Sequence, residues 1–70
     1  MERTAVTSSI LKSVGYDPAT QTLEIEFNDG GIYRYFGVPA EVFESLLAAP
    51  SPGSYFHAHI RSAYPYTKGA

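Results

Sequence analysis

The chain of 70 residues contains no cysteine and no tryptophan, and only 17 % of its residues are charged. The absence of cysteine excludes disulfide bonds, thiolate metal ligands and cysteine nucleophiles. No apolar run approaches the roughly 18 residues that a membrane-spanning helix needs. The polar N-terminus lacks the apolar core of a signal peptide. These absences predict a soluble cytoplasmic protein without a membrane partner.

Aromatic residues are plentiful, with six tyrosines and four phenylalanines. A chain of this length allows one small domain, and its core depends on such large rings. The net charge of −2 argues against general binding of polyanions. The charges are unevenly distributed, since all seven acids precede residue 45. Residues 51–70 are therefore mildly basic, and they also contain both histidines.

Two segments in the first half alternate as β-strands do. Thr22–Phe27 alternates without a fault, with Leu23, Ile25 and Phe27 toward the core and Thr22, Glu24 and Glu26 toward water. In residues 10–16, Ile10, Val14 and Tyr16 share a face that Lys12 interrupts, so we expect this strand at a sheet edge. Between them, Asp17 before Pro18 predicts a turn in which its carboxylate binds the backbone two residues on. Residues 1–8 lack periodicity and are expected to form a flexible tail, which leaves 9–68 as the domain.

The glycine turn after the second strand leaves two registers open. A two-residue loop would put Arg34 on the core face. A type I turn with Gly30 as a left-handed bulge would put Arg34 on the solvent face, opposite Glu24, and direct Tyr33 and Tyr35 into the core. We prefer the second register because it pairs the charges and fills the core with rings. This third strand is expected to end at Gly37.

Prolines mark the expected helices. Pro39 suits the first position of a helix that ends before Pro50, and Ser51 can cap a second helix that runs to about Arg61. The aromatic tail 63–68 is expected to pack back over the sheet or a helix. The fold class is α+β: a three-stranded antiparallel β-meander followed by two short helices packed on one face. The expected core is Leu23, Ile25, Phe27, Tyr33, Tyr35, Phe43, Leu46, Leu47, Phe56 and Ile60.

The order of these signals resembles the KTSC domain family, whose name comes from its occurrence at the C-terminus of some lysyl-tRNA synthetases. Tyr33-x-Tyr35 matches the tyrosine-x-tyrosine hallmark of the family, and the resemblance covers about residues 8–68. It implies a stand-alone small bacterial or phage protein and, through the synthetases, an RNA partner. The matching segments are 16–18, 23–27, 30–35, 38–39, 51–56, 60–61 and Tyr64.

Basic residues interleaved with aromatic ones give two candidate sites for single-stranded nucleic acid. One is Tyr33-Arg34-Tyr35, although the preferred register makes both rings part of the core. The stronger candidate lies near the C-terminus, where no acid is close in sequence. Its residues are Arg61, Tyr64, Tyr66 and Lys68, together with the two histidines.

Metal binding and catalysis find little support. On a helix, His57 and His59 would point about 200° apart, and no third ligand is suggested. No serine lies in a nucleophile-elbow pattern, and Glu24 and Glu26 are expected on a solvated face. We therefore expect no cofactor, no metal site and no enzymatic activity. A hydrolase or small-ligand binder would need a deep pocket at one of the histidines.

The sequence thus favours a small non-enzymatic module that binds RNA or single-stranded nucleic acid weakly. The alternative is a protein–protein interaction module that uses the free edge of the first strand or the exposed side chains of Ile32 and Phe36. The oligomeric state is left open.

Overall fold

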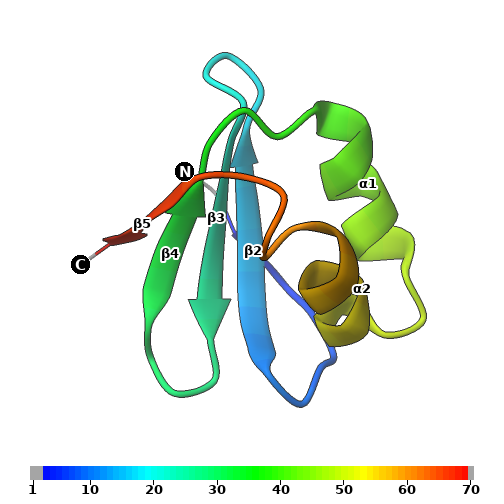
Figure 1. Cartoon of the computed structure of the whole chain (residues 1–70). Coiled ribbons are helices and arrows are strands. Elements are labelled where there is room, and N and C mark those ends of the chain that lie inside the picture. The colour runs from blue at the N-terminus through cyan, green and yellow to red at the C-terminus, as the bar shows by residue number, and fades with distance from the viewer. Residues whose placement is uncertain (1–2, 70) are drawn as a thin grey trace.

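The computed structural model describes residues 3–69 as one antiparallel sheet with two helices (Figure 1). The strand order is β1-β2-β3-β4-β5, so each strand pairs with its neighbour in sequence. Both helices lie between β4 and β5 in the chain. The α+β class is confirmed, but the described sheet has five strands rather than three. The elements are β1 Arg3–Ala5, β2 Leu11–Asp17, β3 Thr22–Phe27, β4 Ile32–Tyr35, α1 Ala40–Ala48, α2 Pro52–His59 and β5 Tyr66–Gly69.

The two additional strands form the edges of the sheet. Arg3–Ala5 pairs with β2, although a flexible tail was expected over residues 1–8; residues 1 and 2 lie outside the described part. The expected edge strand, β2, is therefore an interior strand. At the other edge, Tyr66–Gly69 pairs with β4, so the aromatic tail does pack against the sheet, as a strand. Both edge strands are mostly exposed, and their backbone pairing needs no apolar alternation.

A β-bulge in β2 changes which of its side chains face the core. The register with β3 shifts between Leu11 and Ser13, which leaves Lys12 as the extra residue. Leu11 and Val14 are consequently both buried, while Ile10 is 44 % exposed. The predicted face of Ile10, Val14 and Tyr16 is therefore wrong in its first member, because the bulge breaks the alternation and Leu11, not Ile10, is buried together with Val14.

The β3–β4 hairpin has the preferred register. Tyr33 lies opposite Ile25, Tyr35 opposite Leu23, and Arg34 opposite Glu24. Gly30 has φ of +94°, the left-handed conformation that this turn requires. The charge-pairing argument is confirmed, and it sets both tyrosines on the helix side of the sheet.

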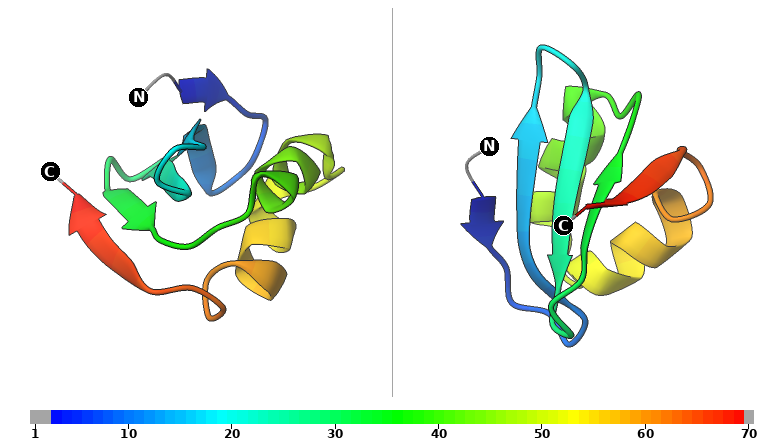
Figure 2. Two further views of the ribbon diagram at one scale, coloured as in Figure 1. Left: turned by 90° about the horizontal axis from the view of Figure 1, so that it is seen from above. Right: turned by 90° about the vertical axis from the view of Figure 1, so that its left-hand side faces the viewer.

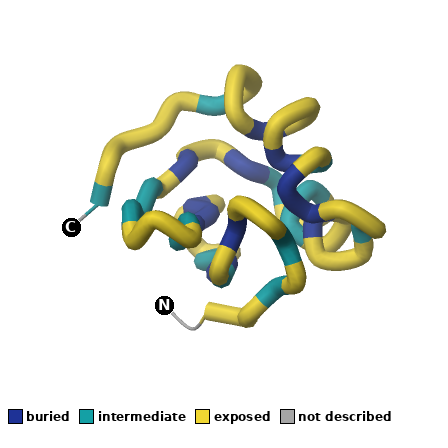
Figure 3. The backbone as a smooth tube through the Cα atoms, turned by 90° about the horizontal axis from the view of Figure 1, so that it is seen from below, coloured by how far each residue is buried: buried dark blue, intermediate teal, exposed yellow. Residues whose placement is uncertain are grey.

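The helices cover one face of the curved sheet, and the buried stretches lie between these two layers (Figures 2 and 3). Six of the predicted core residues are buried: Leu23, Ile25, Tyr35, Leu46, Phe56 and Ile60. Leu47 is 38 % exposed, which corrects its assignment to the core. Adjacent helical residues point about 100° apart, so α1 turns Leu46 toward the sheet and Leu47 away from it. The half-buried members are Phe27, Tyr33 and Phe43.

The helix boundaries follow the prolines and serine closely. Pro39 occupies the capping position, so α1 begins at Ala40, one residue later than expected, and Ala49 before Pro50 is extended. Ser51 caps α2 with Pro52 at its first position, but its hydroxyl bonds the Ser54 hydroxyl rather than a backbone N–H. Because α2 ends at His59, the predicted end residue Arg61 lies in the following turn.

Candidate binding groove

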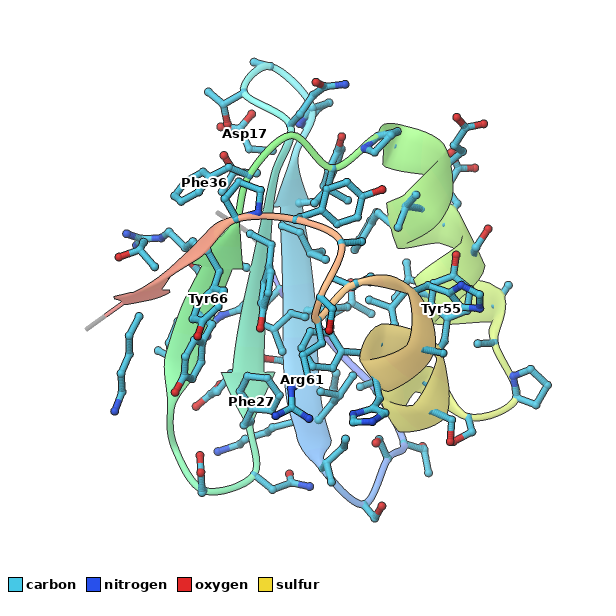
Figure 4. All side chains as sticks on the ribbon, in the orientation of Figure 1. Asp17, Phe27, Phe36, Tyr55, Arg61 and Tyr66 are labelled. Atoms are coloured by element: carbon cyan, nitrogen blue, oxygen red, sulfur yellow. The ribbon has the colours of Figure 1, made fainter. Side chains whose placement is uncertain are left out.

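An open groove of about 630 Å³ runs between α2 and the helix-covered face of the sheet. We call it the aromatic groove, because Phe27, Tyr33, Tyr35, Phe56 and Tyr66 form its floor and wall. Arg61 and His57 line it from the helix side, and Asp29 lines it from the hairpin turn. In Figure 4, Arg61 and Phe27 lie close together in front of β2 and β3, with Tyr66 over β4.

The five rings form a closed circuit. Phe27, Tyr33, Tyr66, Tyr35 and Phe56 follow one another around it with ring centroids 5.3 to 5.7 Å apart, and Phe56 returns to Phe27 at 5.4 Å. Most of the pairs are steeply inclined or edge-on, an arrangement that the ring quadrupole favours. Tyr66 is 56 % exposed and presents the most accessible ring of the circuit.

Strand geometry explains how the tyrosines meet. Tyr33 and Tyr35 are two residues apart in β4 and so leave the sheet on the same face. Tyr66 lies directly opposite Tyr35 in β5, which brings its side chain to that face as well. The two candidate sites that the sequence kept apart, one on the tyrosine pair and one near the C-terminus, are therefore joined in one groove.

The Tyr35 hydroxyl is open to the groove. The Tyr35 residue is 3 % exposed, yet no hydrogen bond to its hydroxyl occurs within residues 3–69. The same residues contain no fully buried side-chain oxygen or nitrogen without a partner, so this oxygen is reached from the groove. Burial raises the pKa of Tyr35, and the neighbouring Tyr66 and Tyr33 raise it further, while Arg61 opposes them. The hydroxyl therefore stays protonated at neutral pH and can donate a hydrogen bond.

Arg61 brings a positive charge to the groove from the turn after α2. Its backbone N–H donates to the Phe56 carbonyl at 3.0 Å, which anchors the residue against the helix end. Its Nη1 lies 3.2 Å from Nδ1 of His57, four residues earlier. Within residues 3–69 no carboxylate lies within 4.0 Å of the Arg61 guanidinium. The charge of Arg61 is thus left to interact with an anion from outside.

Arg34, the other arginine among the candidate residues, lies on the opposite face of the sheet. Its Nε donates to Glu24 Oε2 at 3.0 Å, and Arg3 approaches Glu24 Oε1 at 3.4 Å. These two side chains cover the carboxylate, so Glu24 is 8 % exposed instead of facing water as predicted. The short strand β1, which supplies Arg3, is the reason for the difference. Arg34 is consequently part of an ion-pair cluster and not of the aromatic groove.

The remaining candidate residues are separated from one another. Tyr64 is half-buried against the core, and Lys68 is exposed in β5 outside the groove lining. His57 lines the groove, whereas the His59 ring lies 4.6 Å from that of Tyr55. Within residues 3–69 no three metal-ligating side chains gather, and neither helix could cross a membrane.

Sequence reasoning missed that Phe27 and Phe56 belong to the groove as well as to the hydrophobic interior. It also missed the pairing of β4 with β5 that brings Tyr66 to Tyr35. The signal available was the run Tyr66-Thr67-Lys68, in which an aromatic and a β-branched residue favour a strand. The run is short and its side chains do not alternate between buried and exposed, so the signal was weak.

These features define a small α+β domain with an aromatic groove beside its second helix. The family model of the KTSC domain matches residues 7–64, and the chain therefore belongs to the KTSC domain family. The resemblance inferred from the sequence is confirmed.

Relatives of known structure and sequence agree with this assignment. The crystal structure of a KTSC domain protein from Yersinia pestis has a TM-score of 0.96 and 36 % identity, and the match covers 99 % of this chain and 97 % of that one. An uncharacterized protein of Stutzerimonas stutzeri is 53 % identical over 57 residues, 81 % of this chain and 80 % of its own length. A lysine–tRNA ligase of Nostoc is 50 % identical over 58 residues, 83 % of this chain but 10 % of the ligase.

Proposed function

We propose that the protein is a non-enzymatic module that binds single-stranded RNA weakly through the aromatic groove. The observation that carries the proposal is the position of Arg61, a cation without a carboxylate neighbour in residues 3–69, in the same groove as the exposed ring of Tyr66. Proteins that bind single strands combine stacking rings with cations that contact phosphate. Arg61 and Tyr66 supply one group of each kind.

The groove offers a role for each part of a nucleotide. A base can stack on Tyr66, a phosphate can accept hydrogen bonds from the Arg61 guanidinium, and the Tyr35 hydroxyl can bond a base edge or a 2′-hydroxyl. The net charge of −2 keeps the affinity low, because the protein as a whole repels a polyanion. Such a partner would place the protein in the cytoplasm.

The Nostoc relative supports RNA as the partner class. Its name describes a ligase that acts on tRNA, and the segment similar to this chain is one tenth of its length. A domain that binds an unpaired stretch of RNA could contact tRNA when it is part of a ligase, and could bind RNA as a separate protein.

An NMR titration with an oligouridylate of twelve nucleotides tests the proposal. We expect backbone amide shifts at Arg61, Tyr33, Tyr35 and Tyr66 in about 50 mM salt, which weaken strongly in about 500 mM salt. In Arg61→Gln the affinity should fall at least about tenfold, since a charge-assisted hydrogen bond contributes about 1.5–3 kcal/mol. Lys12→Gln is the matched control, because it removes one positive charge from an exposed residue of β2 outside the groove. Equal losses in the two variants, or no shifts at either salt concentration, would contradict the proposal.

A second candidate function is protein–protein interaction through a sheet edge. In the described residues β1 and β5 are the outermost strands, and each can accept a further strand from a partner. The edge predicted from the sequence, β2, is covered, and Ile32 is only half-buried in β4 while Phe36 is 38 % exposed. Self-association at high concentration that is indifferent to Arg61→Gln would favour this alternative.

A further inference from the structure

We infer that the aromatic groove accepts a single nucleotide with one phosphate on Arg61, and does not track a longer stretch of strand. This inference rests on the proposed function and specifies its ligand. It follows from the size of the groove, from the distribution of cations around it and from the unpartnered hydroxyl within it.

The groove has the size of a small-molecule site. Its volume of about 630 Å³ lies within the range of about 300–1,000 Å³ that is typical of such pockets. Its walls come from α2 on one side and from β3, β4 and β5 on the other, and the hairpin turn at Asp29 borders it. Tyr66 is the one exposed residue of the ring circuit, while Phe27 and Tyr33 are half-buried and Tyr35 and Phe56 are buried, so a base can stack most readily on Tyr66.

Among the described residues, no second lysine or arginine lines the groove beside Arg61. Arg3 and Arg34 are held by Glu24, and Lys12 lies 3.9 Å from Glu26. Lys68 is exposed in β5 opposite Tyr33, but it does not line the groove. Among the residues that line the groove, a strand with several phosphates would therefore meet one arginine or lysine, Arg61.

The acid at the groove border disfavours additional phosphates. Asp29 lines the groove, and its Oδ1 accepts a hydrogen bond from the Gly31 N–H at 2.8 Å, which holds the carboxylate in place. A di- or triphosphate would bring more negative charge into the groove that this carboxylate lines, and like charges repel. The groove therefore favours a monophosphate over a polyphosphate.

The Tyr35 hydroxyl points to a nucleoside next to the phosphate. It belongs to a residue that is 97 % shielded from solvent, it opens into the groove, and no described residue binds it. A ribose hydroxyl or a base carbonyl is a suitable partner. The hydrogen bond would be lost with inorganic phosphate alone.

The test compares uridine, uridine 5′-monophosphate, uridine 5′-triphosphate and the oligouridylate of twelve nucleotides by NMR titration. We expect the monophosphate to shift the groove residues, uridine to bind at least about fivefold more weakly, and the triphosphate to bind no more tightly. After correction for its twelve equivalent nucleotides, the oligomer should bind within about threefold of the monophosphate. The oligomer should show a logarithmic salt slope near about −0.7, the value for one phosphate contact on a single strand.

Three other results would overturn the inference, and they are distinguishable from failure of the proposed function. An oligomer that binds far more tightly per nucleotide than the monophosphate, with a slope of about −2 or steeper and shifts at Lys68, would show an extended site and leave RNA binding intact. Equal binding of uridine and its monophosphate would contradict a phosphate contact, and tighter binding of the triphosphate would contradict the preference for one phosphate. No binding by any of the four compounds would refute the proposed function itself. In Arg61→Gln, uridine and its monophosphate should bind equally, which assigns the phosphate to that side chain.

Discussion

Arginine side chains are paired with a carboxylate on one face of the sheet and lack a carboxylate partner on the other, within residues 3–69. On the outer face, Glu24 lies between Arg3 and Arg34, with the Arg34 contact at 3.0 Å, and is almost fully covered by them. On the helix-covered face, the close side-chain partner of Arg61 is the imidazole of His57. The first arrangement cancels charge within the protein, while the second leaves a positive charge beside aromatic rings.

This difference shows why residue type alone does not define a candidate binding residue. Arg34 stands between two tyrosines in the sequence and Arg61 stands near two others, so both patterns suit a nucleic-acid contact. Only the carboxylate neighbours distinguish them, and these come from other strands. A cation paired in the fold stabilises the fold, and an unpaired one is available to a ligand.

The largest expected effect concerns the apolar interior of the helix-covered face. Leu46→Ala should lower the free energy of unfolding by about 2–5 kcal/mol, because it leaves a cavity at a residue with no exposed surface. Leu47→Ala is the matched control, and its 38 % exposure predicts a loss of about 0.5–1 kcal/mol. Urea denaturation measures both. Similar losses in the two proteins would contradict the assignment of Leu46 to the core.

Stability on the outer face should depend on charge instead. Glu24→Gln weakens the contacts to both Arg3 and Arg34, and we expect it to lower the free energy of unfolding by about 1.5–3 kcal/mol. Glu44→Gln, at an exposed position of α1, should change it by less than about 0.5 kcal/mol. Urea denaturation at neutral pH compares them, and binding of oligouridylate should be unaffected in either protein. An unchanged stability in Glu24→Gln would show that the cluster is not structural.

Removal of the exposed ring tests the groove without disturbing the interior. Tyr66→Ala should weaken binding of uridine 5′-monophosphate by about 5- to 100-fold, because stacking on an aromatic side chain contributes about 1–3 kcal/mol per base. Leu47→Ala, an exposed apolar residue away from the groove, should bind as the unchanged protein does. NMR titration provides the affinities. A Tyr66→Ala protein of normal affinity would remove stacking on this ring from the account.

The smallest expected effect concerns the protonation of Tyr35. Its pKa is raised in the folded protein, chiefly by burial, so the unfolded chain loses this proton first as the pH rises. The stabilising contribution is therefore complete below the ordinary tyrosine pKa of about 10 and is lost as the pH rises through the folded value. Between about pH 9 and 11, the unfolding free energy of the unchanged protein should fall more steeply than that of Tyr35→Phe. Parallel curves from urea denaturation would contradict the raised pKa of Tyr35.

Much of the fold could be predicted because local chemistry determines it. The glycine turn and the Glu24–Arg34 pairing define the hairpin register, and Pro50 marks the end of α1. The edge strands could not be predicted, because they are held by backbone hydrogen bonds and their side chains show no apolar alternation. The bulge at Lys12 likewise left the alternation of β2 ambiguous.

The candidate groove could be predicted only in pieces. Arg61 and Tyr66 were identified as one group and Tyr33 and Tyr35 as another, but their union depends on β5 pairing with β4. Arg34 was grouped with them because it stands between the two tyrosines, although its pairing with Glu24 was expected. The second cation on Glu24, Arg3, comes from a strand at the N-terminus that the sequence does not signal. Tertiary pairing, and not residue chemistry, therefore separated the two arginines.

A crossed comparison of Arg34→Gln and Arg61→Gln tests the central claim most directly, with unfolding in urea and titration with oligouridylate measured on both proteins. Arg34→Gln should lower the free energy of unfolding by about 0.5–1 kcal/mol and leave the affinity within about twofold. Arg61→Gln should leave stability within about 0.5 kcal/mol and lower the affinity at least about tenfold. If both substitutions weaken binding equally, the two faces do not differ as their ion pairs indicate, and the positive charge acts without a defined site.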